Sequence, residues 1–323
     1  MNILAIISRD LQKGSTKYRI GQYLEYLMSK GINFEFVQRG SLNASVVRKA
    51  RQFDLVFNQK CLFRYSLAKK LIANSRRILF DFDDAIYTRP GNPHSLLTGL
   101  RVKRRLHLWL KRSDIVTTSN YFLARYARRY SDSVEVIPMA LDLDTWKPSE
   151  KRFGEKITIG WTGAPVNVPL IESLGSVFSF LLKKYASLKL AIFSGQKPKF
   201  KCPFEYYSFR PGHEPAFVQR LHIGVLPLAN EEYSMGKSPI KAIQYLACGV
   251  PVVGNVIGAT GEILNVENSI AVSNEEQWIR GLEKLITNGE LTESMGRAGC
   301  EQVQKNHNLK LAGEQLFKVL VGS

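Results

Sequence analysis

Short apolar runs recur along the chain at intervals that leave room for a helix between them. In the first half, six such runs have the length and composition of buried strands: Ile3–Ser8, Phe34–Gln38, Leu55–Asn58, Ile78–Phe82, Ile115–Thr118 and Val134–Pro138. In the second half, four more have the same character: Ile157–Trp161, Leu188–Phe193, Ile223–Pro227 and Val250–Gly254. The pattern predicts about ten strands, spread over both halves of the chain.

Amphipathic stretches between these runs predict helices. In Arg19–Lys30, residues Ile20, Tyr23, Leu24 and Leu27 fall on one helical face. Further helices are predicted at Tyr121–Tyr130, Leu170–Tyr185, Lys237–Cys248, Glu275–Asn288 and Leu291–Asn306. Regular alternation of strands and helices with short connections predicts an α/β fold with parallel sheets and right-handed crossovers.

The alternation restarts near residue 157, which predicts two doubly wound domains. The length of 323 residues suits two domains of about 150 residues each. Leu141–Phe153, which contains Pro148 among charged residues, is the predicted connection. We therefore expect an N-terminal domain over 1–148, a C-terminal domain over 149–305, and a helix over 306–323 that packs back toward the first domain. Two such sheets in series place a ligand cleft between them, at the carboxyl ends of the strands.

Composition adds the compartment. Hydrophobic residues make up 45% of the chain, which is ordinary for a globular protein, and no run reaches the roughly 18 apolar residues needed to span a bilayer. The four cysteines are scattered without a paired motif, and the five histidines show no metal spacing. We therefore expect a soluble, cytoplasmic protein without disulfides or a zinc site.

Charge distinguishes the two halves. Residues 1–150 carry 26 Lys and Arg against 13 Asp and Glu, whereas residues 151–323 carry 19 against 15. A domain this basic is suited to an anionic partner, although excess Lys and Arg also keep proteins soluble. Arg101–Arg112 combines a basic face with Leu106, Trp109 and Leu110, so it is a candidate for peripheral contact with an anionic membrane, at its inner face. An ordinary basic surface helix is the alternative, and no nucleic-acid-binding module is visible.

The segment Pro227–Val253 carries the most specific chemistry. A strand ends at Pro227, and a helix is predicted to start near Ser238 or Pro239, because proline suits the first helical turn. Lys237 and Lys241 are four residues apart and would share a face of that turn, whose free N–H groups favour an anion. These features predict a pyrophosphate site without a P-loop, with Gln244 two turns further on for ribose hydroxyls. An exposed lysine pair on an ordinary helix is the alternative.

This segment resembles the signature region of the retaining glycosyltransferase family 4, which has the GT-B fold of two Rossmann-like domains facing a central cleft. The resemblance runs from Gly224 to Glu262 and is closest to a branch with the pattern GKxxxKxxQ, here Gly236 to Gln244. Segments that agree in the same order are Asp81–Ile86, Ser119–Asn120, Ile159–Pro165 and Met295–Gly299. The resemblance covers most of the chain beyond residue 75.

The resemblance implies transfer from a nucleoside-diphosphate sugar, with retention and without a metal ion or other cofactor. Many members carry a Glu-x7-Glu pair where this chain has Gly236 and Gln244, and an arginine in the loop that here reads Ile159–Pro165. We infer that Lys237 and Lys241 neutralise the diphosphate instead, and that Gln244 replaces the ribose-binding carboxylate. The other predicted donor-binding residues are Thr162, Gly163, Ser194, Gly195, Gly236, Ser238 and Gly258, although several of these glycines and serines suit plain turns.

In the N-terminal domain, Asp81, Asp83 and Asp84 end an apolar strand on the cleft side. Paired carboxylates can act as a general base or bind a metal; our preferred role for Asp83 and Asp84 is to orient a sugar hydroxyl. Capping by Asp84, with Asp83 turned to solvent, is the alternative. By resemblance, the acceptor-side residues are Gly14, Ser15, Arg19 and Asn120.

The sequence therefore predicts a glycosyltransferase that modifies a saccharide or a lipid-linked saccharide in the synthesis of cell-surface polysaccharides or glycoconjugates. Its candidate catalytic residues are Asp83, Asp84, Lys237 and Lys241. Two alternatives are a nucleotide-sugar 2-epimerase and an inactive nucleotide-sugar-binding protein of the same architecture. The alternative of an inactive protein rests on the absence of the Glu pair.

Overall fold

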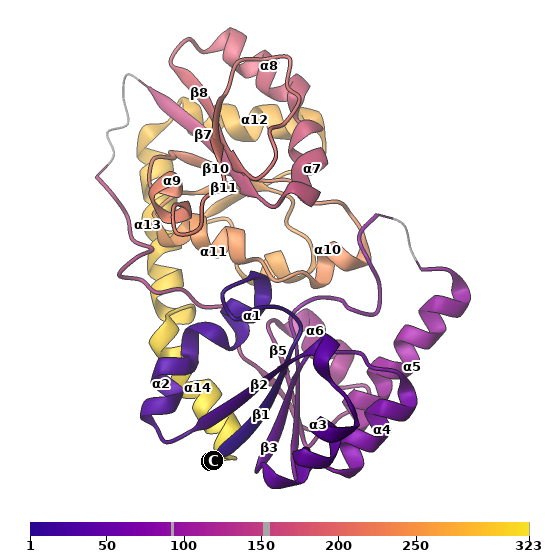
Figure 1. Cartoon of the computed structure of the whole chain (residues 1–323). Helices are drawn as coiled ribbons and strands as arrows, with labels where there is room; N and C mark the ends of the chain where they lie inside the picture. Colours follow the sequence, from indigo (N-terminus) through magenta and orange to yellow (C-terminus); the bar gives the residue numbers. More distant parts are fainter. Residues whose placement is uncertain (92–93, 151–155, 323) are drawn as a thin grey trace. The chain divides into compact units, whose positions relative to one another are not determined.

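The computed structural model describes residues 1–91, 94–150 and 156–322, and its strands form two parallel six-stranded sheets (Figure 1). The chain divides into two compact units. Unit 1 comprises Met1–Ala140, Glu231–Ser238 and Leu309–Ser323, and unit 2 comprises Leu141–Asn230 and Pro239–Asn308. The inclusion of Glu231–Ser238 in unit 1 was not anticipated from the sequence. The predicted connection falls in unit 2, and its last residues, 151–153, lie outside the described residues.

The sheet of unit 1 has the order β2-β1-β3-β4-β5-β6. Its strands are β1 (Asn2–Ile7), β2 (Asn33–Gln38), β3 (Leu55–Gln59), β4 (Ile78–Phe82), β5 (Ile115–Thr118) and β6 (Val134–Val136). Each coincides with a predicted run to within two residues at either end. Because the side chains of a strand alternate between faces, Ile3, Ala5 and Ile7 of β1 join one core, and Leu4 and Ile6 join the other.

Helices cover both faces of this sheet. One face packs against α3 (Ala44–Lys49), α4 (Tyr65–Ala73), α5 (Leu96–Arg112) and α6 (Tyr121–Ala127). The other packs against the segment that holds α1 (Gly14–Arg19), η1 (Gly21–Tyr23) and α2 (Leu24–Ser29), and against α14 (Leu309–Val321). The short helix α10 (Glu232–Gly236) also belongs to unit 1, as do the 3-10 turns η2 (Arg39–Ser41) and η3 (Ala50–Gln52). Both faces are therefore buried, as apolar parallel strands require.

The sheet of unit 2 has the order β12-β11-β10-β7-β8-β9, which is the Rossmann order with the topological switch between β7 and β10. Its strands are β7 (Ile157–Gly163), β8 (Leu188–Ser194), β9 (Glu205–Ser208), β10 (Ile223–Leu226), β11 (Val252–Gly254) and β12 (Ser269–Ala271). The two edge strands, β9 and β12, were not predicted from the sequence. Both are short, and β9 has no fully buried residue.

Helices again lie on both faces of the unit 2 sheet. One face packs against α7 (Val168–Glu172), α8 (Gly175–Lys184) and α12 (Glu275–Ile286). The remaining elements are α9 (Glu214–Val218), α11 (Ile240–Ala247) and α13 (Gly289–Asn306), with the 3-10 turns η4 (Pro165–Asn167) and η5 (Gly258–Glu262). In Figure 1, α13 runs alongside α11.

Two predicted helices are broken. Arg19–Lys30 is interrupted after α1, where Ile20 leaves the helical region and Gly21, a poor helix former, follows. Leu170–Tyr185 is divided between α7 and α8 by Ser173 and Leu174. In both stretches the apolar spacing was read correctly, but a periodic pattern does not reveal a change of helix axis.

Candidate functional site

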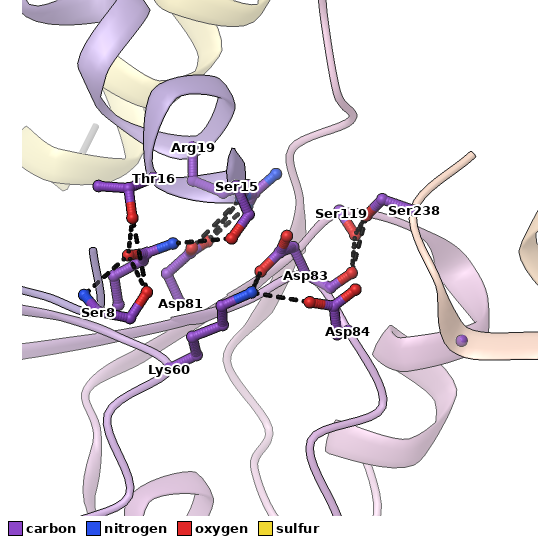
Figure 2. Close-up of polar contacts among 12 residues, drawn as sticks. Ser8, Ser15, Thr16, Arg19, Lys60, Asp81, Asp83, Asp84, Ser119 and Ser238 are labelled. Atoms are coloured by element: carbon purple, nitrogen blue, oxygen red, sulfur yellow. Dashed lines mark hydrogen bonds and ion pairs between the residues drawn. The ribbon is translucent and has the colours of Figure 1, made fainter. Parts of the chain in front are cut away.

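Polar side chains gather at the carboxyl edge of the unit 1 sheet, where β1, β3 and β4 end (Figure 2). In the order β2-β1-β3, the chain leaves β1 toward one side of the sheet and leaves β3 toward the other. A reversal of this kind opens a crevice at the carboxyl ends of the two strands, where doubly wound proteins bind ligands. Gln59 ends β3 and Lys60 follows it at this position, and the carboxylates of Asp83 and Asp84 follow the neighbouring strand β4.

Gln59, the last residue of β3, is buried and holds the segment that follows β1. Its Oε1 accepts hydrogen bonds from Ser8 Oγ and Thr16 Oγ1, both at 2.9 Å, and from the Ser8 N–H at 3.2 Å. Its Nε2 lies 3.4 Å from Ser15 Oγ. Gln59 therefore positions Ser15, which the sequence assigned to the acceptor side together with Gly14, the first residue of α1.

Arg19 is buried and forms an ion pair with Asp81 of β4. Its Nε donates to both carboxylate oxygens, at 3.1 and 3.2 Å, and its Nη1 donates to the carbonyl of Ile137. Thr117 Oγ1 also donates to Asp81, at 2.8 Å. The sequence assigned Arg19 to the acceptor side; in this structure its guanidinium instead joins α1 to β4 and to the segment after β6.

Lys60 lies between the two predicted carboxylates. Its Nζ is 2.7 Å from Asp83 Oδ1 and 2.7 Å from Asp84 Oδ2. The contact with Asp84 has hydrogen-bond geometry, and the contact with Asp83 is a short ion pair. Lys60 has a φ of +45°, the left-handed region that non-glycine residues avoid. Strained backbone of this kind concentrates at functional sites.

The surroundings of Lys60, Asp83 and Asp84 shift the pKa values of Asp83 and Lys60. Burial, reinforced by the neighbouring Asp84, raises the pKa of Asp83 from 3.8 to about 6, although Lys60 opposes the shift. Burial alone would lower the pKa of Lys60, but Asp83 and Asp84 outweigh it and raise that pKa. Asp83 thus titrates near neutral pH beside a permanently charged amine. The alternative in which Asp83 is turned to solvent is wrong, because the side chain is buried.

The segment that ends α10 completes this edge of unit 1. Ser238 Oγ donates to the carbonyl of Asp83 at 2.8 Å and lies 2.6 Å from Ser119 Oγ. Asn120 Nδ2 donates to the carbonyl of Gly236 at 3.3 Å, and its Oδ1 caps α6 by accepting from the Leu123 N–H at 2.9 Å. Asn120, predicted on the acceptor side, is buried and acts here as a helix cap.

Lys237 does not share a helical turn with Lys241. The sequence predicted a helix from Lys237, but α11 begins at Ile240, and Lys237 is an extended residue that follows α10. Pro239 disfavours helical backbone at Ser238, which precedes it, so a helix cannot readily run from Lys237 into α11. The predicted diphosphate set is thus divided between Gly236, Lys237 and Ser238 in unit 1 and Lys241 and Gln244 in unit 2.

Lys241 occupies the first turn of α11, directly after the Pro239 cap position. No side-chain hydrogen bond caps this helix. The Lys241 amine is 2.9 Å from Glu214 Oε1 on α9, and both side chains are partly exposed. Gln244 lies one turn further on and is buried. An uncapped helix start with a lysine in its first turn favours an anion, and Glu214 holds that lysine in place.

The other predicted donor residues lie mainly at the carboxyl ends of β7 and β8. Gly163 and Ser194 are the last residues of these strands and pair in register, and Gly195 follows. The Thr162 N–H donates to the hydroxyl of Tyr245 at 2.9 Å. A Cβ on Gly163 would lie 2.1 Å from the Trp161 ring, so packing requires this glycine. Gly258 begins η5, after β11.

The basic helix differs from the sequence interpretation. Leu106, Trp109 and Leu110, expected to face lipid, are fully buried in the core of unit 1. No single helix in 1–91, 94–150 or 156–322 is long and apolar enough to cross a membrane; only the bent pair Pro165–Glu172 and Gly175–Lys184 has the length and composition. In the same residues, no group of three or more His, Cys, Asp or Glu side chains could hold a metal ion.

Sequence reasoning missed Lys60 and Gln59. Lys60 is one of 45 basic residues, and nothing in its neighbours marks the left-handed backbone that turns its amine toward Asp83 and Asp84. The available signal was position: both residues directly follow the predicted strand Leu55–Asn58, at the edge that already carried the carboxylates.

The chain matches no protein-family model and no curated protein sequence. It is similar to several solved structures over nearly its whole length. Sucrose-phosphate synthase of Thermosynechococcus elongatus matches with a TM-score of 0.76 and 14% identity, over 99% of this chain and 98% of that one. HepE of Anabaena in complex with UDP-glucose matches with a TM-score of 0.71 and 15% identity, over 100% of both chains. An alpha-glucosyltransferase in complex with UDP and a 13-mer DNA matches with a TM-score of 0.62 and 14% identity, over 99% of both.

These likenesses, with the two parallel Rossmann-like sheets, show that the chain has the GT-B fold. The predicted fold class is therefore confirmed.

Proposed function

We propose that this protein transfers a sugar from a uridine-diphosphate sugar to a hydroxyl of a saccharide or lipid-linked saccharide. The observation that carries the proposal is the start of α11: an uncapped helix with Lys241 in its first turn, following the switch strand β10 of a Rossmann-ordered sheet. This is the chemistry that a diphosphate requires. Solved neighbours of this fold hold UDP or UDP-glucose, which favours the same donor class here.

The reaction breaks the bond between the anomeric carbon and the diphosphate oxygen and forms one to the acceptor oxygen. Negative charge grows on the departing diphosphate, so Lys241 and the N–H groups of α11 stabilise the transition state more than the ground state. Glu214 fixes the lysine through their ion pair. With retention, the acceptor approaches the face that the diphosphate leaves, and its proton passes to the departing oxygen. No metal ion and no protein nucleophile are needed.

The carboxylate edge of unit 1 suits the second substrate. Asp83 and Asp84 are acceptors for sugar hydroxyls, and the charge of Lys60 offsets part of their mutual repulsion. Fixing the orientation of the acceptor hydroxyl lowers the barrier through orientation rather than through proton transfer. Ser15, fixed by Gln59, offers a further hydroxyl contact at the same edge.

Calorimetry with UDP tests the donor site. We expect Lys241→Ala to weaken UDP binding at least about tenfold, because a charge-assisted contact to phosphate contributes roughly 1.5–3 kcal/mol. Lys284→Ala, on the exposed last turn of α12, removes the same charge elsewhere in unit 2 and should leave the affinity unchanged. Equal affinity of Lys241→Ala and the unchanged protein would refute the assignment.

A panel of labelled nucleotide-sugars then separates the activities. Transfer or slow donor hydrolysis, undiminished by EDTA, supports a metal-independent transferase. Isomerised donor without an acceptor would identify an epimerase instead. Tight binding with no turnover of any donor would identify a binding protein and contradict the proposed reaction.

A further inference from the structure

The first half of α5 presents leucines to solvent. Leu96, Leu97 and Leu100 are 88%, 68% and 66% exposed, although leucine is usually buried. The buried residues of α5 begin only at Leu106, so the preceding turns are not covered by the core of unit 1. In Figure 1 this half of α5 extends away from the sheet of unit 1.

The exposed leucines and basic side chains share one face of the helix. Leu97, Leu100, Arg104 and Lys111 are spaced by three, four and seven residues, which places them on one side of α5. Leu106, Trp109 and Leu110 occupy the opposite side and pack into the core. The helix therefore has an outer face, defined by Leu96, Leu97, Leu100, Arg101, Lys103 and Arg104, that is apolar at its start and basic further along.

Charge around this outer face has a single sign. Leu96–Arg112 contains six basic and no acidic residues, and neighbouring α4 adds Lys69 and Lys70, again without a carboxylate. Two cations lie over the ring of Tyr65 on α4: Arg104 Cζ is 4.6 Å from the ring centroid, and Lys69 Nζ is 5.1 Å from it. These cations are gathered at the junction of α4 and α5 rather than dispersed.

A depression of about 440 Å³ adjoins the same two helices. Three arginines line it, Arg39 from η2, Arg64 before α4 and Arg105 on α5, together with the apolar residues Leu62, Phe63 and Leu67. Guanidinium groups over an apolar floor suit a phosphate group that is attached to a hydrocarbon chain.

We propose that unit 1 binds the surface of an anionic phospholipid bilayer through the outer face of α5. The leucines enter the boundary between headgroups and acyl chains, the basic residues meet lipid phosphates, and Arg39, Arg64 and Arg105 bind one phosphate in the depression. A bilayer uses both parts of this surface. A nucleic-acid duplex would use the charge but leave three exposed leucines unexplained. The proposal does not depend on the proposed sugar transfer.

Sedimentation with lipid vesicles tests the proposal. The unchanged protein should bind vesicles of phosphatidylcholine mixed with phosphatidylglycerol and should bind pure phosphatidylcholine at least about tenfold more weakly, because each basic residue near an anionic surface strengthens binding about fivefold. Added salt should reduce binding to the mixed vesicles but not abolish it, because the leucine contribution is not screened.

Matched variants separate the two contributions. Leu96→Ser with Leu97→Ser and Leu100→Ser should weaken binding to mixed vesicles at least about tenfold, whereas Val266→Ser, at an exposed residue of unit 2, should not. Arg101→Gln with Lys103→Gln and Arg104→Gln should weaken it by more than about tenfold. The control for net charge replaces three exposed lysines of unit 2 by glutamine: Lys183, Lys201 and Lys305. Unchanged thermal unfolding would show that each variant is folded.

Three results would overturn the proposal. The first is no binding to mixed vesicles. The second is equal loss in the α5 charge variant and its unit 2 control, which would indicate net charge alone. The third is binding to a DNA duplex that outcompetes the vesicles and is unaffected by the leucine variant, which would identify a nucleic-acid surface.

Discussion

At the scale of single residues, Asp83 couples protonation to folding. Its carboxylate is buried beside Asp84, and the pKa of Asp83 is raised from 3.8 to about 6. Between these two values the folded chain binds the proton more tightly than the unfolded chain. The stability that protonated Asp83 gives to the folded chain is thus fully present below pH 4 and is lost as the pH rises through 6.

We expect Asp83→Asn to remove this pH dependence. As the pH rises from about 4 to 7, the protein with Asp83 should lose roughly 2–3 kcal/mol of unfolding free energy relative to the variant. Urea unfolding at a series of pH values measures it. Asp132→Asn, an exposed carboxylate of the same unit, is the control and should show a nearly constant difference. A constant difference for Asp83→Asn as well would contradict the raised pKa.

The sequence could predict which carboxylates lie at this site, but not what surrounds them. Asp83 and Asp84 follow an apolar run, and parallel strands bring such ends to one edge. Their partner Lys60 is 23 residues upstream of Asp83, directly after a different strand, and reaches them through a left-handed backbone conformation that no sequence signal marks. Arg19 was singled out, but only the structure reveals its ion pair with Asp81.

At the scale of elements, α10 is held in unit 1 by close packing. A Cβ on Gly236 would lie 2.8 Å from Ala85 Cβ and 3.0 Å from Leu123 Cδ2. The carbonyl of Gly236 accepts from Asn120, and Ser238 binds the carbonyl of Asp83. The glycine that resemblance assigned to donor binding therefore has a structural reason of its own.

We expect Gly236→Ala to destabilise unit 1 by about 1–3 kcal/mol, because the added methyl group cannot fit without displacing α10. Helix propensity alone would make this substitution stabilising, because alanine forms helices more readily than glycine, so the expected destabilisation has the opposite sign. Gly40→Ala is the control, since a Cβ there meets nothing within 4 Å, and it should change stability by less than about 0.5 kcal/mol. Thermal unfolding measures both changes in stability. A stabilised Gly236→Ala protein would show that the packing around Gly236 is not tight.

Strands were easier to predict than helices. Central strands of parallel sheets are buried on both faces, so continuous apolar runs marked all eight central strands; the edge strands β2 and β6 were also predicted. β9, with the sequence Glu-Tyr-Tyr-Ser, lies at an edge and lacks that run. Helix starts depend on single residues instead: Pro239 disfavours helical backbone at Ser238, and the helix predicted from Lys237 begins at Ile240.

At the scale of the whole molecule, the path of the chain is not sequential. Glu231–Ser238 and Leu309–Ser323 lie late in the sequence and yet belong to unit 1. Helix α14 contributes Ala312, Leu316 and Leu320 to the core that contains Tyr23 and Leu27, and Arg77 donates to the carbonyl of Leu320 at 2.8 Å. From the sequence, the helix over 306–323 was expected to pack toward the first domain, although hydrophobic patterning by itself shows only that α14 has a face to bury.

This path makes unit 1 depend on the end of the chain. Leu316→Ala should lower stability by about 2–5 kcal/mol, because it leaves a cavity in the core shared with α2 and β1. Hydrogen exchange should quicken in β1, β2 and α2, roughly 280 to 310 residues away in sequence, and stay unchanged in α12, which is closer along the chain but belongs to unit 2. Leu311→Ala, on the exposed side of α14, is the matched control and should leave both the stability and the hydrogen exchange unchanged. Faster exchange confined to α12 and α13 would mean that α14 stabilises unit 2 instead.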